Sequence, residues 1–142
     1  MGLDTSHECW HGSYSSFSRW RDKLAEAAGY TFHPLPGDRG MPSSVVLVDL
    51  DWGGIEAIIG RHLLGKWPRM PVRPDGTADP LIVLLAHSDC EGEIQAEFCA
   101  PLANRLEALL PLLGDEAYIA KTQTIIGGLR VAAAADEPVQ FH

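Results

Sequence analysis

Residues 101–114 read PLANRLEALLPLLG, and this stretch decides the class of fold. Its leucines recur three and four positions apart, which places them on one face of an α-helix. These leucines are Leu102, Leu106, Leu109, Leu110 and Leu113. Pro101 is expected to open the helix because proline is tolerated at the first helical position, and Gly114 is expected to end it.

Two longer helices are expected on either side of this stretch. A last helix is expected to begin at Asp115 or Glu116, where apolar residues again recur at helical spacing. The first helix is expected over residues 12–29. The Ser13 side chain can cap its start, and Gly29 can follow its last turn.

Two shorter helical patterns lie in the middle of the chain. Asp79 and Pro80 combine a capping carboxylate with a proline, so a short helix is expected from there to Ala86. Apolar residues between Ile55 and Leu63 also recur at helical spacing.

The remaining segments indicate a small β-sheet and loops. Residues 45–50 are apolar and rich in β-branched side chains, and residues 138–142 alternate apolar and polar, as strands do. Proline and glycine make residues 30–44 and 66–79 irregular. We expect one mostly helical α+β domain over residues 1–142, with a small β-sheet formed by the termini and one internal strand.

Composition limits the partners. Eleven Lys and Arg against nineteen Asp and Glu give a net charge of −8. Binding to nucleic acid polymers or anionic membranes needs an excess of cations, so neither is expected. The start of the chain lacks the basic and apolar regions of a secretory signal, and its three cysteines are an odd number. We therefore expect a cytoplasmic protein with reduced thiols.

The segment HSDCEG, residues 87–92, resembles the middle of an EF-hand calcium loop, with carboxylates followed by glycine. The ends of that loop do not match, because His87 and Phe98 occupy positions that need carboxylates. We therefore expect a tight turn between two helices rather than a calcium site. Gly92 would supply a positive φ, and Asp89 would cap the turn.

Histidines near the N-terminus suggest a different metal site. His7 and His11 are four positions apart, which would place both on one face of a helix. Together with Asp4, His87 and Asp89 they could hold zinc, manganese or iron. The glycine after His11 argues against a continuous helix, and surface histidines that form hydrogen bonds are the simpler alternative.

Aromatic and basic residues lie close together in the N-terminal segment, at and before the start of the predicted first helix. Trp10 and Tyr14 lie close in sequence to Arg19 and Arg21. Aromatic faces beside arginines can hold a base and its phosphate. An aromatic stripe on a helix is also typical of core packing, so both interpretations stay open.

Several segments resemble a family of small proteins from bacteriophages and prophage-bearing bacteria. They are GLDTSH from Gly2, Cys9-Trp10, Gly12, Tyr14-Ser15, Phe17, LLAHSDCEGEI from Leu84, Leu106-Glu107, Leu110-Pro111, Gly128-Leu129-Arg130 and Phe141-His142. Relatives more often carry Asp where this chain has Glu91. The resemblance implies a phage setting, in which small accessory proteins often blunt host defences, and it implies the host cytosol.

The leading hypothesis is a cytosolic accessory protein that binds a small nucleotide-like ligand and so sequesters a host immune signal. Its expected ligand contacts are His7, Trp10, His11, Tyr14, Arg19, Arg21, His87 and Asp89. One alternative is a hydrolase of such a signal whose metal is held by Asp4, His7, His11, His87 and Asp89. The other is an inhibitor that binds a host protein through the loops rich in proline and glycine. Assembly of identical copies stays open, and the His7–Trp10 segment is expected to fold against the His87 turn.

Overall fold

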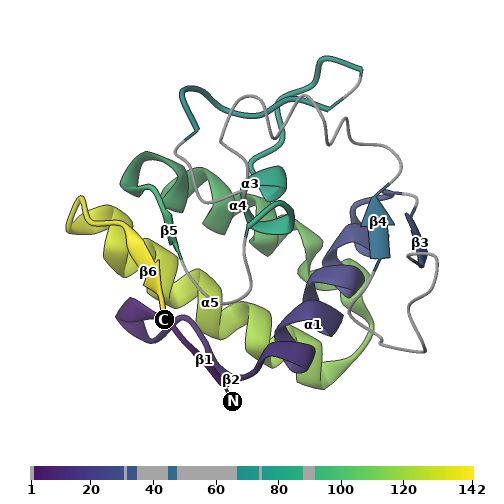
Figure 1. The fold of residues 1–142 in the computed structure, drawn as a ribbon, viewed down its shortest axis with the longest axis horizontal. Helices are drawn as coiled ribbons and strands as arrows, with labels where there is room; N and C mark the ends of the chain where they lie inside the picture. The colour runs from purple at the N-terminus through teal and green to yellow at the C-terminus, as the bar shows by residue number, and fades with distance from the viewer. Residues whose placement is uncertain (1, 31, 35–44, 48–66, 74, 88–91) are drawn as a thin grey trace.

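The computed structural model describes residues 2–30, 32–34, 45–47, 67–73, 75–87 and 92–142. Figure 1 shows helices around a common core, with short strands from both ends of the chain beside them. The α-helices are α1 (Tyr14–Ala27), α3 (Leu81–Leu85), α4 (Ala96–Leu113) and α5 (Glu116–Ala134). The predicted mostly helical α+β class is confirmed. The helix expected between Ile55 and Leu63 lies outside the described residues.

Helix α1 begins and ends where its sequence predicts. The Ser13 hydroxyl accepts a hydrogen bond from the Ser16 amide at 3.1 Å and caps the first turn. Gly29 follows the last turn with a φ of +85°, a conformation that glycine adopts without strain. Phe17 and Trp20 on this helix are fully buried. The cap fixes the start of α1. The buried face of the helix packs inward, and α1 also contacts the two N-terminal strands directly.

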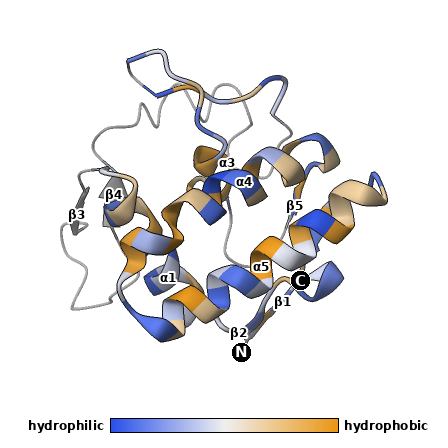
Figure 2. Ribbon diagram, turned by 180° about the vertical axis from the view of Figure 1, so that it is seen from behind, coloured by the Kyte–Doolittle hydropathy of each residue, from blue (hydrophilic) through white to orange (hydrophobic). Residues whose placement is uncertain are grey.

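Helices α4 and α5 make the most extensive contact between elements in the described chain. Gly114 ends α4 with a φ of +70°, and the Asp115 carboxylate caps α5 by accepting a hydrogen bond from the Ala117 amide at 2.8 Å. Figure 2 colours α3 as hydrophobic, whereas α1 and α5 alternate hydrophobic and hydrophilic bands, as amphipathic helices do. Among the described residues, no helix combines the length and the apolar character needed to cross a bilayer.

The prediction that Pro101 opens α4 is wrong. The helix begins earlier, at Ala96, after Gln95. A proline inside a helix removes one hydrogen bond and crowds the carbonyl one turn back. In α4 the residues before the proline include Phe98 and Cys99, which are buried in the core. Their burial holds the backbone helical in spite of the proline.

The two ends of the chain meet in antiparallel strands. These are β1 (Gly2–Asp4), which pairs with β2 (His11–Ser13), and β5 (Gly92–Ile94), which pairs with β6 (Val139–Phe141). Asp4 and His142 exchange two backbone hydrogen bonds of 2.9 Å, and Thr5 forms a bridge with Phe141. These contacts join β1 to β6, so the termini lie together as predicted (Figure 1).

The prediction that the strand from Val45 joins the terminal strands is wrong, because that strand pairs elsewhere. The internal strand beside β6 is β5, which lies in the segment expected to be a turn. Gly92 has the expected positive φ, +102°, and the chain then runs extended until α4 begins. Phe98 lies in the first turn of α4, at the position where a calcium loop needs a carboxylate ligand. The predicted cap, Asp89, lies outside the described residues.

A further strand pair lies in the middle of the chain. β4 (Val45–Leu47) confirms the first part of the strand predicted from Val45, and it pairs with β3 (Phe32–Pro34). The prediction that residues 30–44 form only a loop is therefore wrong at β3. Its proline stands at the end of the strand, where a missing amide is tolerated.

Asp79 anchors the start of α3. This carboxylate is buried and accepts hydrogen bonds from the Leu81 amide at 3.0 Å and from the Tyr30 hydroxyl at 2.7 Å. The Arg105 guanidinium donates to it at 3.1 Å. The predicted helix start is confirmed, and the charge of Asp79 is paired with Arg105 from α4, as a buried carboxylate requires.

Candidate functional site

The N-terminal strands form a β-hairpin with His7-Glu8 as its two-residue turn. The Cys9 amide donates to the Ser6 carbonyl at 3.4 Å, and both turn residues have positive φ, 58° and 55°. Such a turn is of the I′ type, which glycine and asparagine favour. The usual sequence signal for a hairpin is therefore missing. His7 and His11 do not share the helix that the metal hypothesis requires.

The two histidines point to different partners. His7 Nε2 lies 3.4 Å from a Glu137 carboxylate oxygen, and its Nδ1 lies 2.9 Å from the Ser6 hydroxyl. His11 is largely exposed, and its Nδ1 pairs with the Asp4 carboxylate. In the described part of the chain, no three His, Cys, Asp or Glu side chains are grouped to hold a metal ion. Asp89, the remaining candidate ligand, lies outside that part.

Gly128 allows the hairpin turn to rest directly on α5. A β-carbon at this position would lie 2.4 Å from the Cys9 sulfur and 2.7 Å from the His7 carbonyl oxygen. Both distances are shorter than van der Waals contact, so only glycine permits this approach. The contact fixes the position of the hairpin relative to α5.

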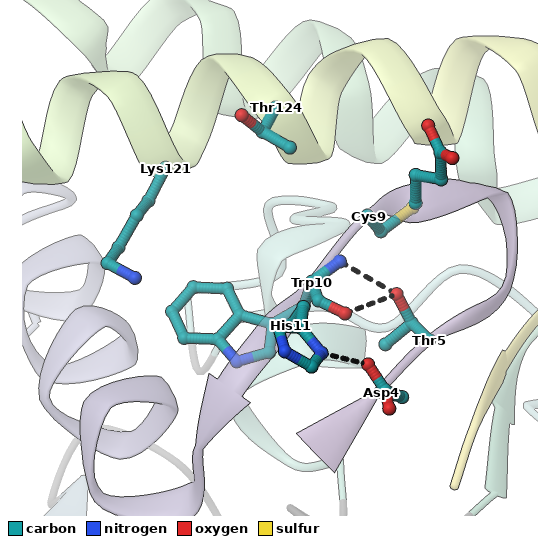
Figure 3. A pocket seen from close by; sticks show the side chains of 8 residues that line it. Asp4, Thr5, Cys9, Trp10, His11, Lys121 and Thr124 are labelled. Atoms are coloured by element: carbon teal, nitrogen blue, oxygen red, sulfur yellow. Dashed lines mark hydrogen bonds and ion pairs between the residues drawn. The ribbon is translucent and has the colours of Figure 1, made fainter. Parts of the chain in front are cut away.

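A cavity of about 450 Å³ opens between the hairpin and α5 (Figure 3). Its volume lies within the range of small-molecule sites, roughly 300–1,000 Å³. Trp10 and Cys9 are buried and form its base, whereas most of the other lining side chains are more exposed and polar. The lining residues are Asp4, Thr5, Glu8, Cys9, Trp10, His11, Lys121 and Thr124.

Lys121 covers the indole ring of Trp10. Its ammonium lies 4.4 Å from the ring centroid, within the range of a cation–π contact. Trp20 and Phe17 pack against the same indole, with centroids 5.4 Å and 5.2 Å away. The indole Nε1 is buried and has no hydrogen-bond partner among the described residues. Trp10 is therefore a rigid aromatic surface, supported by the core and covered by one flexible cation.

Cys9 is a protonated thiol at neutral pH. Burial raises its pKa to about 12, the nearby Cys99 adds to this, and a hydrogen bond with Thr5 opposes it. Burial likewise raises the pKa of Cys99 to about 11. A protonated, buried thiol is a poor nucleophile, so Cys9 contributes shape and apolar surface to the cavity.

Arg21 and His87 lie beside the hairpin and outside the described cavity lining. The Arg21 guanidinium donates to the His87 carbonyl at 2.5 Å and lies 4.6 Å from the Phe17 ring centroid. The His87 ring stacks on Phe141 with centroids 4.1 Å apart, and Phe141 forms the bridge with Thr5. The N-terminal segment and the His87 segment thus meet through Phe141.

The structure brings two of the predicted ligand contacts, Trp10 and His11, to the cavity. Tyr14 is half-buried and Arg19 exposed on α1, and neither is in the described lining. The sequence does not predict Lys121 as a lining residue, because it lies far from Trp10 along the chain and no local pattern links the two. No family model, no curated protein and no solved structure matches this chain.

Proposed function

We propose that this cavity binds a small, polar, nucleotide-like ligand. The observation that carries the proposal is the Lys121 ammonium held 4.4 Å from the centroid of the Trp10 indole. A planar base can take the place of the ammonium on the indole, and the ammonium can then contact an oxygen atom of the ligand. Aromatic surfaces combined with cations are the usual means by which proteins hold single bases.

The exchange on the indole is energetically reasonable. A cation–π contact near the surface is worth roughly 0.5–1 kcal/mol. Stacking of a base on an aromatic side chain is worth roughly 1–3 kcal/mol. Lys121 has four rotatable side-chain bonds, so its ammonium can leave the indole without a change in the backbone of α5. A ligand that stacks on Trp10 would therefore gain more than the displaced lysine loses.

The rest of the lining supports binding rather than turnover by cysteine chemistry. Asp4, His11 and Thr124 supply hydrogen-bond donors and acceptors for the edges of a ligand. Cys9 stays protonated because burial raises its pKa to about 12. Given the resemblance to phage proteins, we propose that the protein acts in the host cytosol and sequesters a nucleotide-like immune signal.

Calorimetric titration with the four ribonucleosides and their 5′-monophosphates tests this proposal. We expect at least one to bind the wild-type protein and to bind Lys121→Gln at least fivefold more weakly, or about 1 kcal/mol. The matched control is Lys23→Gln, which removes an ammonium on α1 that lies 3.6 Å from Glu26, outside the described cavity lining. The control should bind as the wild type does.

Two results would contradict the proposal. One is the absence of heat of binding for all eight compounds at about 1 mM, a concentration that detects even weak complexes. The other is equal affinity of the wild type and Lys121→Gln for a compound that does bind. Equal unfolding midpoints of both proteins in urea would show that the comparison is made between folded proteins.

A further inference from the structure

Glu8 and Lys121 carry opposite charges and line the same cavity, and neither forms an ion pair with another described residue. The Glu8 side chain is exposed, and its carboxylate has no hydrogen-bond or ion-pair partner among the described residues. The Lys121 ammonium rests on the Trp10 indole, and no described carboxylate pairs with it. Two unpaired, opposite charges that line one cavity are groups available to a ligand.

The other carboxylate of the lining is already engaged. Asp4 pairs with His11, which lies directly opposite it in the hairpin. Of the described lining residues, two therefore bring a carboxylate and one an ammonium. The whole chain has a net charge of −8, so its long-range field also repels anions.

We propose that these charges make the cavity selective for nucleosides and singly charged relatives over nucleoside polyphosphates, with Glu8 as the specificity-determining residue. This inference rests on the proposed function. Glu8 would accept hydrogen bonds from a base amino group or from ribose hydroxyls, while Lys121 meets a single ligand oxygen. Several phosphate charges would be repelled by the two carboxylates, and this repulsion is strongest at low ionic strength because both carboxylates are exposed and salt screens them.

The hairpin fixes Glu8 in this position. The two-residue turn leaves its backbone little freedom, and the turn rests on α5 through the close approach of Cys9 to Gly128. The Glu8 carboxylate is therefore presented from a rigid support on one wall of the cavity. Lys121 and Thr124 are presented from the other wall, α5 (Figure 3). A ligand that reaches both walls would meet the carboxylate and the ammonium.

The experiment compares each ribonucleoside with its 5′-triphosphate by calorimetry in a magnesium-free buffer, for the wild type and for Glu8→Gln. We expect the nucleoside to bind the wild type at least tenfold more tightly than the triphosphate. Glu8→Gln should reduce this ratio at least fivefold, because it removes one repulsive charge and keeps the shape of the side chain. The matched control is Glu26→Gln, which removes an exposed carboxylate of α1 outside the described lining and should leave the ratio unchanged.

The possible results separate this inference from the proposed function. If the triphosphate binds as tightly as the nucleoside or more tightly, the selectivity is wrong while nucleotide binding stands. If the preference exists but survives Glu8→Gln, the assignment of Glu8 is overturned. If no nucleoside or nucleotide binds, the proposed function fails, and the selectivity fails with it.

Discussion

At the hairpin turn, His7 and Glu8 hold a backbone conformation that is costly for residues other than glycine. A left-handed conformation costs such a residue about 1–2 kcal/mol. His7 has contacts that offset this cost, since its imidazole meets both Ser6 and Glu137. Glu8 has no such contact among the described residues. Its φ of 55° is therefore strain that the local side-chain contacts do not relieve.

Replacing Glu8 by glycine should consequently stabilise the protein. We expect Glu8→Gly to raise the free energy of unfolding by about 1 kcal/mol, because glycine adopts positive φ without steric strain. Urea denaturation measures this change. The control Glu8→Gln keeps the strain and should match the wild type within about 0.5 kcal/mol. Equal stability of the glycine and glutamine variants would argue against a strained turn.

Two adjacent glycines of α5 provide a second test at single positions. Gly128→Ala places a methyl group where the Cys9 sulfur and the His7 carbonyl already lie, so the hairpin must move away from α5. We expect a loss of about 1–3 kcal/mol, as for overpacked cores. Gly127→Ala meets no atom within 4 Å and should gain about 0.5–1 kcal/mol from helix propensity. Thermal or urea unfolding of both variants measures whether each substitution lowers or raises the free energy of unfolding.

A Gly128→Ala variant at least as stable as Gly127→Ala would contradict the close approach at Gly128. The pair is informative because both substitutions add the same methyl group to the same helix. Only the surroundings of the added β-carbon differ.

Among the elements, α1 carries a carboxyl group in an unfavourable position. Burial raises the pKa of Asp22 to about 6, and the neighbouring Arg21 lowers it only in part. The unfolded value is roughly 3.9, so the folded protein holds this proton more tightly. The contribution of Asp22 to the free energy of unfolding is therefore most favourable below pH ~4. It declines as the pH rises towards ~6, and above that it is unfavourable and no longer changes.

The variant Asp22→Asn removes this titration. At pH 7.5 it should be more stable than the wild type by about 1 kcal/mol, a value below the full pKa shift because the group is only half-buried. Near pH 4 the difference should vanish, because Asp22 is then protonated in the folded state. Urea unfolding across this pH range measures the difference, with Glu26→Gln as an exposed control on the same helix. A difference that does not change with pH would contradict the assignment.

The elements also show which signals a sequence carries. Ser13, Gly29, Gly114 and Asp115 act through backbone groups within a few residues, and the ends of α1, α4 and α5 follow from them. Pro101 predicted the wrong helix start. The preference of proline for the first turn is weaker than the stabilisation gained by burying the helical residues before it. Strand β3 was not predicted, because strand pairing depends on a distant partner and because prolines and glycines surround this strand in the sequence.

On the scale of the whole molecule, the cavity is a product of tertiary contacts. One wall comes from the N-terminal hairpin and the other from α5, and only Gly128 lets them approach so closely. The N-terminal sequence pointed to Trp10 and His11 because aromatic and imidazole groups are chemically conspicuous. Lys121 and Thr124 carry no such signal in a helix with an ordinary amphipathic pattern. The position of one wall could be predicted from its residues, whereas the opposite wall required the fold.

The pairing of Asp4 with His142 has a consequence for the order in which the molecule is assembled. A two-stranded hairpin is marginal by itself, and this one also contains a strained turn, so it needs β6 beside it. Contacts between positions so far apart in the chain form late, since closing a long loop costs entropy. A nascent chain emerges from the ribosome beginning at its N-terminus. The cavity would therefore be completed only after β6 has left the exit tunnel, and ligand capture would begin after that point.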